Sequence, residues 1–147
     1  MSALRILLGL IVFSIAGAAH AADPIYTGRF SSTALGGHDA VAYFTEGKPV
    51  EGSKAFSLEW QGATWRFASR ANLEAFRADP AAYAPQYGGH CAYAVAYGGT
   101  APGDPEVWRI VDGKLYLNLN PEIGRRWAKD IPGFIEKADA NWPGVLD

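Results

Sequence analysis

The sequence predicts an α+β fold, in which small antiparallel β-hairpins pack with short helices. Two segments alternate apolar and polar residues on either side of a tight turn, as half-buried strand pairs do. A serine or asparagine follows each hairpin and is suited to cap a helix, and each helix is followed by an aspartate and a proline that suit the start of another.

The first 21 residues are expected to be a signal peptide. Arg5 provides a positive charge, residues 6–16 are apolar, and Ala19-His20-Ala21 has the small residues of a cleavage site. The apolar run is shorter than the roughly 20 residues of a membrane-spanning helix, so we expect no stable membrane span after cleavage. An uncleaved N-terminal anchor is the alternative. The signal predicts a periplasmic or secreted protein.

The chain after the leader is expected to be acidic. Arg5 is the only charged residue among the first 21, so 12 basic residues remain beside 15 acidic ones. Nucleic-acid-binding proteins carry clustered basic residues, and this sequence has no such block, so it predicts no nucleic-acid partner. The remaining length suits one domain that folds without disulfides.

The N-terminal part is expected to be an arm over residues 22–37, followed by a single domain over residues 38–147. The arm mixes small and polar residues without a clear period. The apolar segment at residues 38–44 is bounded by glycines, which favours a short strand or turn.

The first hairpin is predicted at residues 55–60 and 64–67, with Gln61-Gly62-Ala63 as its turn. Ser69 is the expected cap of a helix over residues 70–78, and Asp79-Pro80 begins a shorter one. Residues 87–89 are expected to be a loop. Residues 90–97 are apolar almost throughout, which favours a buried helix, with a strand as the alternative.

The second hairpin is predicted at residues 107–111 and 114–119 around Asp112-Gly113. Helices are then expected from Asn120 to about residue 129 and from Asp130 toward Trp142. Five residues of the first unit have a residue of similar chemistry 51 positions further along the chain. Gly62, Ser69, Phe76, Asp79 and Tyr83 correspond to Gly113, Asn120, Trp127, Asp130 and Phe134. The pattern suggests a two-fold ββαα internal repeat, although any hairpin followed by a helix uses these residue types.

The rarest residue is Cys91, the only cysteine, which follows His90 in a glycine-rich segment. A lone cysteine in an exported protein could be a metal ligand, a reactive thiol, an intermolecular disulfide or a buried apolar residue.

Part of the chain resembles the YHS-domain proteins of the exported bacterial type. The resemblance is carried by Trp60-x-Gly62-x-x-Trp65-x-Phe67-x-Ser69, by Phe76 and Asp79-Pro80-x-x-Tyr83, and by His38-Asp39-x-Val41-x-Tyr43-Phe44. It covers residues 35–97, and residues 107–142 resemble the C-terminal ββαα extension of this subgroup. Metal-handling relatives carry cysteines at places that correspond to residues 40–42, Ala68 and Asn72, and this sequence has none of these thiols.

The loss of those thiols leaves four candidate metal ligands: His38, Asp39, His90 and Cys91. Mixed imidazole, thiolate and carboxylate ligands suit copper or zinc. The resemblance therefore implies an exported, metal-associated binding protein, with Cys91 and His90 as the first candidate ligands and His38 and Asp39 as possible partners.

The alternative is a metal-free module that binds a small ligand or a protein, with Cys91 buried. Tyr43, Tyr87, Tyr93 and Tyr97 would then line a pocket or pack in the core. The sequence contains none of the motifs GxSxG, HExxH or CxxC and no phosphate-binding loop, so we expect no enzyme.

Overall fold

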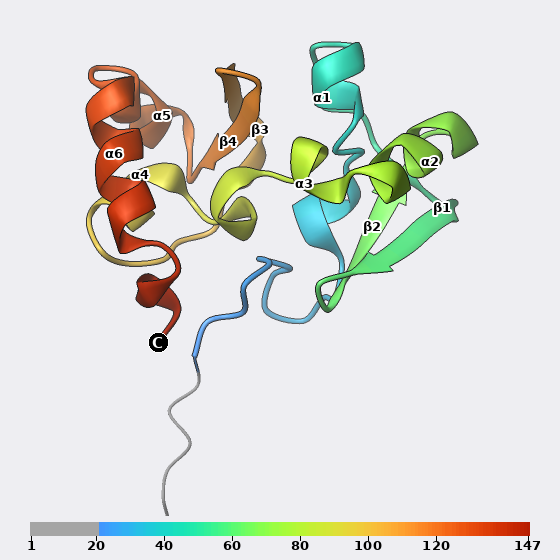
Figure 1. Cartoon of the computed structure of the whole chain (residues 1–147), viewed down its shortest axis with the longest axis horizontal. Helices are drawn as coiled ribbons and strands as arrows, with labels where there is room; N and C mark the ends of the chain where they lie inside the picture. Colours follow the sequence, from blue (N-terminus) through green and yellow to red (C-terminus); the bar gives the residue numbers. More distant parts are fainter. Residues whose placement is uncertain (1–20) are drawn as a thin grey trace, which may run out of the picture.

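The computed structural model describes residues 21–147 (Figure 1). The signal-peptide prediction falls on residues outside this range, apart from Ala21. Within the described range, no helix has both the length and the apolar character that crossing a membrane requires.

The first half of the chain contains one hairpin and several short helices. Its elements are the 3₁₀ turn η1 (Ala34–Gly37), α1 (Ala42–Thr45), β1 (Ser53–Trp60), β2 (Ala63–Phe67), α2 (Arg70–Ala78) and α3 (Pro80–Tyr83). The predicted hairpin and the two helices after it are confirmed.

The second half repeats this order of elements. It contains η2 (Gln86–Gly89), α4 (Ala92–Ala96), β3 (Asp104–Val111), β4 (Lys114–Asn118), α5 (Pro121–Trp127), α6 (Ile131–Asn141) and η3 (Gly144–Leu146). The helix predicted at residues 90–97 is therefore confirmed in its centre, and the alternative strand is not formed. Each hairpin is its own two-stranded antiparallel sheet, so the α+β prediction is confirmed (Figure 1).

The two hairpins share their turn geometry and register. Both central residues of each turn have positive φ, 48° and 76° at Gln61-Gly62 and 50° and 74° at Asp112-Gly113, as type I′ turns require. The pairs Ser53↔Phe67 and Asp104↔Asn118 lie 51 residues apart, and the register shifts after each. The two-fold ββαα internal repeat stays a prediction.

Of the two alternatives predicted for residues 38–44, a short strand or a turn, the structure shows a helical turn. His38 forms only an isolated bridge, to Glu51, and α1 begins soon after it. The reason is Asp39, whose Oδ1 accepts hydrogen bonds from the backbone N–H groups of Val41 (2.9 Å) and Ala42 (3.2 Å). A side-chain oxygen that satisfies these free donors favours a helical turn over an extended strand.

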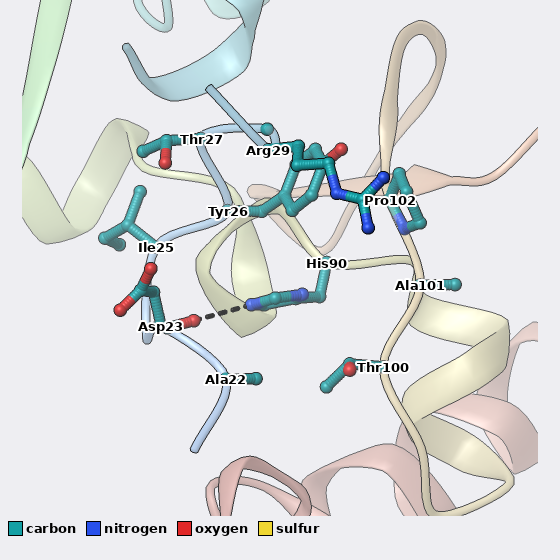
Figure 2. Close-up of a pocket in the computed structure, with 11 residues that line it drawn as sticks. Ala22, Asp23, Ile25, Tyr26, Thr27, Arg29, His90, Thr100, Ala101 and Pro102 are labelled. Atoms are coloured by element: carbon teal, nitrogen blue, oxygen red, sulfur yellow. Dashed lines mark hydrogen bonds between the residues drawn. The ribbon is translucent and has the colours of Figure 1, made fainter. Parts of the chain in front are cut away.

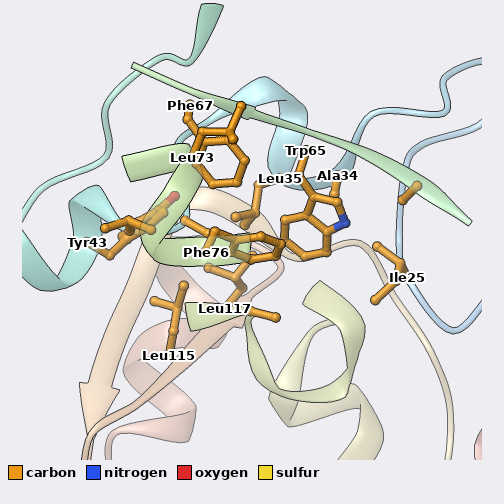
Figure 3. Close-up of a cluster of buried hydrophobic side chains, with 14 residues drawn as sticks. Ile25, Ala34, Leu35, Tyr43, Trp65, Phe67, Leu73, Phe76, Leu115 and Leu117 are labelled. Carbon is orange, nitrogen blue, oxygen red and sulfur yellow. The ribbon is translucent and has the colours of Figure 1, made fainter. Parts of the chain in front are cut away.

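The main hydrophobic cluster contains residues of both halves (Figure 3). The ring of Phe76 lies 5.0 Å from those of Trp65 and Phe67, measured between centroids, and Leu115 and Leu117 from β4 complete the cluster. A second cluster lies among α4, β4, α5 and α6 and includes Tyr87, Val95, Tyr116, Trp127 and Ala138. Because β4 contributes to both clusters, the second hairpin fixes the position of one half against the other.

Candidate functional site

Two Gly-Gly-His turns have the same backbone conformation. Leu35 and Tyr87 have φ/ψ of 54°/26° and 57°/32°, and the glycines that follow them have 56°/23° and 62°/17°. The backbone N–H of each histidine then donates to the carbonyl oxygen three residues earlier, at 3.0 Å in both turns. Sequence reasoning missed this correspondence, although the repeated Gly-Gly-His at a spacing of 52 residues could have revealed it.

The two histidines of these turns have different surroundings. His38 Nδ1 lies 2.9 Å from the Leu35 carbonyl oxygen, and its Nε2 lies 3.6 Å from Oε1 of the exposed Glu106. His90 is 4% exposed, and its Nε2 lies 2.7 Å from the carbonyl oxygen of Asp23 in the arm. Equivalent backbone turns therefore place one imidazole beside a carboxylate and the other against the arm.

The contact with Asp23 defines the tautomer of His90. A carbonyl oxygen can only accept a hydrogen bond, so Nε2 must carry the hydrogen. In the neutral ring Nδ1 is then an acceptor. This buried nitrogen has no hydrogen-bond partner among the described residues, and a buried polar atom normally has one. His90 Nδ1 is thus a buried acceptor that no donor of the described residues satisfies.

The buried Asp39 has a structural role. In addition to the two N–H groups at the start of α1, its Oδ2 accepts from the Ala68 N–H and from Asn72 Nδ2, both at 2.8 Å. Four donors therefore share one carboxylate that is fully buried, and metal ligation by Asp39 would break some of these bonds.

Cys91 occupies the corresponding place in the second half and is 1% exposed. Its Sγ lies 3.6 Å from Oδ1 of Asn118, which also accepts from the backbone N–H of Tyr93 at 3.0 Å. Asn118 thus provides the oxygen that Asp39 provides in the first half. This geometry matches the alternative in which the cysteine is a buried residue.

The four predicted metal ligands have separate partners. His38 faces Glu106, His90 faces the arm, and Asp39 and Cys91 bond to groups inside their own halves. Among residues 21–147, no group of three or more histidine, cysteine, aspartate and glutamate side chains is gathered so that it could hold a metal ion. Metal association through these residues stays a prediction.

A pocket of about 330 Å³ lies beside His90, between the arm and residues 100–102 (Figure 2). Figure 2 shows the side chains of Tyr26 and Arg29 entering from the arm and the backbone carbonyl oxygen of Asp23 facing His90. The complete lining is Ala22, Asp23, Ile25, Tyr26, Thr27, Gly28, Arg29, His90, Thr100, Ala101 and Pro102. The arm residues were missed as candidates, because no local pattern in residues 22–37 indicates what they cover.

The arm is held in place by backbone hydrogen bonds at several points. Tyr26 N donates to the Gly88 carbonyl oxygen, and Ala22 N donates to that of Leu146, both at 2.9 Å. Ile25 is buried in the main cluster. Gly88 has no room for a side chain, because a Cβ there would overlap the carbonyl oxygen of Pro24. The glycine-rich turn is therefore the surface on which the arm docks.

Two of the four tyrosines that were considered as pocket residues belong to the core. Tyr43 donates to the Pro105 carbonyl oxygen and Tyr87 to Oδ1 of Asp139, both at 2.8 Å. Burial raises the pKa of both phenols well above the usual value, and nearby carboxylates, Glu106 for Tyr43 and Asp139 for Tyr87, raise it further. These hydroxyls therefore stay protonated and serve as hydrogen-bond donors.

Of the other two tyrosines, Tyr97 is exposed and Tyr93 is partly buried against the second cluster. The rings of Tyr93 and Tyr97 are 4.9 Å apart, and that of Tyr93 is 5.1 Å from Phe134 on α6. Neither residue lines the pocket beside His90.

Comparison with known proteins identifies one family. The family model of the YHS domain matches residues 41–87, which extend from α1 to the Gly88-Gly89 turn. The match covers the first hairpin, α2 and α3, and confirms the resemblance to YHS domains in this part of the chain. No curated protein and no solved structure matches the chain.

Proposed function

We propose that this chain, whose residues 41–87 form a YHS domain, is an exported binding protein and not an enzyme, and that it takes a small polar ligand beside His90. The observation that carries the proposal is the buried Nδ1 of His90, which has no partner among the described residues although its ring lines a pocket. An acceptor in that state favours a ligand that donates an N–H or O–H group.

The surroundings of His90 support this choice of ligand. The Asp23 carbonyl oxygen holds the Nε2–H, so the ring keeps the tautomer with an acceptor at Nδ1. Asp23 and Arg29 are the only charged residues of the lining and have opposite signs, so the residues around the pocket carry no net charge that would favour a charged ligand. Its size suits a small molecule.

Two probes of the same shape test the donor requirement. Acetamide carries N–H donors and acetone does not. Acetamide, titrated at millimolar concentrations and followed by NMR, is expected to shift the ¹⁵N resonance of His90 Nδ1 and the amide signals of residues 100–102, and acetone is expected to shift neither.

The matched variants are His90→Gln and His38→Gln, because the two histidines occupy equivalent turns and His38 lies outside the pocket. His90→Gln should remove the response to acetamide, and His38→Gln should keep it. Equal responses to the two probes, or no response at residues 100–102, would contradict the proposal.

Copper or zinc association is the second candidate. In many metal sites a histidine donates one ring N–H to a carbonyl or carboxylate and binds the metal through the other nitrogen, and His90 has its Nε2–H held in this way. The described residues bring no further side chains together for such an ion, so water or a small chelator would have to complete the coordination.

Titration of the protein with zinc and copper(II) chlorides tests the metal candidate and shows which residue binds the ion. Binding at His90 alone should be abolished by His90→Gln and unchanged by Cys91→Ser. Loss of binding in Cys91→Ser would instead support the thiolate site that the sequence suggests.

A further inference from the structure

A second cavity, of about 320 Å³, lies between β3 and α5 and shares no lining residue with the His90 pocket. Its polar lining consists of Glu106, Arg109, Asn118, Arg125 and Trp127. Val107, Trp108 and Pro121 provide apolar surface beside them. The cavity thus combines polar side chains with an apolar wall, as small-molecule sites do.

Trp127 contributes a buried hydrogen-bond donor that has no partner. The residue is 2% exposed, and its ring lies 5.5 Å from that of Tyr116. Its Nε1–H finds no acceptor among the described residues, whereas Nε1 of Trp65 donates to the Trp60 carbonyl oxygen at 3.0 Å. Buried indole N–H groups normally have an acceptor, so Trp127 offers an unpaired donor at the wall of this cavity.

The charges that line the cavity favour an anion. Arg109 and Arg125 form no ion pair with any carboxylate in residues 21–147, whereas Arg126, the next residue on α5, pairs with Glu122. The only acidic side chain in the lining is Glu106, and its Oε1 lies 3.6 Å from Nε2 of His38. The lining therefore carries two guanidinium groups and one carboxylate, an excess of one positive charge, which favours a negative ligand.

The first half has no counterpart of this arrangement. At a spacing of 51 residues, Trp127 corresponds to Phe76, Arg109 to Leu58 and Arg125 to Glu74. Phe76 is fully buried among aromatic rings and carries no donor. The donor and both positive charges are thus features of the second half, and the shared architecture does not require them.

We propose that the cavity between β3 and α5 binds a small organic carboxylate. Trp127 Nε1 donates to one carboxylate oxygen, Arg109 and Arg125 balance the negative charge, and the apolar part of the ligand lies against Trp108. A carboxylate fits because it offers two acceptor oxygens and one charge to donors of this type. This site is independent of the one beside His90.

The test uses propionate as the probe and propionamide as its neutral match. The chain has five tryptophans, and the ¹H–¹⁵N spectrum reports each indole N–H separately. Trp127→Phe, which places the residue type of Phe76 at this position, assigns the Trp127 signal. Propionate at millimolar concentrations is expected to shift that signal to saturation, and propionamide is expected to leave it in place.

Neighbouring arginines provide the control. Arg125→Gln should weaken propionate binding by about tenfold, because a charge-assisted contact is lost. Arg126→Gln removes an equal charge outside the lining. It should change the affinity for propionate by less than about twofold, since exposed ion pairs contribute little.

Three results would overturn the proposal: no response of the Trp127 indole to propionate, an equal response to propionamide, or an equal loss of affinity in the two arginine variants. A water molecule that is hydrogen-bonded to the Trp127 indole N–H and stays there when propionate is added would also contradict the proposal. Inorganic phosphate in place of propionate shows whether any oxyanion suffices; binding of phosphate with equal affinity would refute the preference for an organic carboxylate.

Discussion

Replacing Gly88 by alanine is expected to release the N-terminal arm. The new Cβ would overlap the carbonyl oxygen of Pro24, and its three nearest atoms all belong to Pro24 and Ile25 of the arm, so the arm must shift. Gly36→Ala is the matched control. It places the same side chain at nearly the same dihedral angles, but its Cβ meets only Pro105 and His38 at ordinary contact distances of 3.6 and 3.8 Å.

The two variants share one cost and differ in another. A side chain in the left-handed region costs roughly 1–2 kcal/mol in both proteins. Release of the arm from Gly88→Ala would additionally remove the hydrogen bonds from Tyr26 N to Gly88 and from His90 Nε2 to Asp23, at about 1 kcal/mol each. It would also expose the buried Ile25, which costs roughly 1.5–3 kcal/mol.

Gly88→Ala should therefore be less stable than Gly36→Ala by about 3–5 kcal/mol. The free energy of unfolding in urea measures this difference, and amide hydrogen exchange at Tyr26 reports the arm directly. The Tyr26 amide should exchange quickly in Gly88→Ala and stay protected in Gly36→Ala. Equal stabilities together with a protected Tyr26 in both variants would refute the reasoning. Because the arm forms one wall of the His90 pocket, Gly88→Ala should also lose the response to acetamide.

Three further predictions concern buried polar groups. Asp39→Ala should destabilise the fold by about 3–5 kcal/mol in urea unfolding, since several buried donors lose their acceptor. The exposed Glu74→Gln is the control and should change the free energy of unfolding by less than about 0.5 kcal/mol. Similar losses in the two variants would contradict the structural role of Asp39. Burial and Asp139 raise the pKa of Tyr87, so above about pH 10 the unfolded chain loses a proton that the folded chain keeps, and stability should fall by about 1.4 kcal/mol per pH unit for this group. Tyr87→Phe should make that alkaline decline shallower, and an unchanged slope would show that the phenol does not titrate in this way. The thiol of Cys91 should not react with an aromatic disulfide reagent until denaturant is added, because it is buried. Rapid reaction of the thiol in the native protein would show that it lies at the surface.

The fold was largely predictable because its signals are local. Asp112-Gly113 is a strong two-residue turn signal, and Asn120 accepts from the Ile123 N–H at 2.8 Å, as a cap should. These preferences act within a few residues and need no tertiary partner. The sequence left a strand and a turn open for the segment that begins at His38, because the bonds of the Asp39 carboxylate that favour the turn also depend on how Asp39 is held beside Ala68.

The candidate site was predictable only in part. His90 was named because histidine is rare and lies beside the only cysteine, and the structure places it in a pocket. The fold directs Cys91 inward to Asn118 and His90 toward the arm, so neighbours in the sequence have different surroundings. Neither Asp23 nor Arg29 belongs to a motif, and they become site residues only because the arm crosses the glycine turn.

The sequence by itself determined the two hairpins, the capped helices and the YHS resemblance, since turn, cap and alternation preferences are properties of short segments. Only the tertiary structure decided what each polar group meets. It satisfied Asp39 with four donors and left His90 Nδ1 and Trp127 Nε1 without partners among the described residues. The physical reason is that burial makes a hydrogen-bond partner costly to lose, and which groups are buried together depends on contacts between residues that are far apart in the chain.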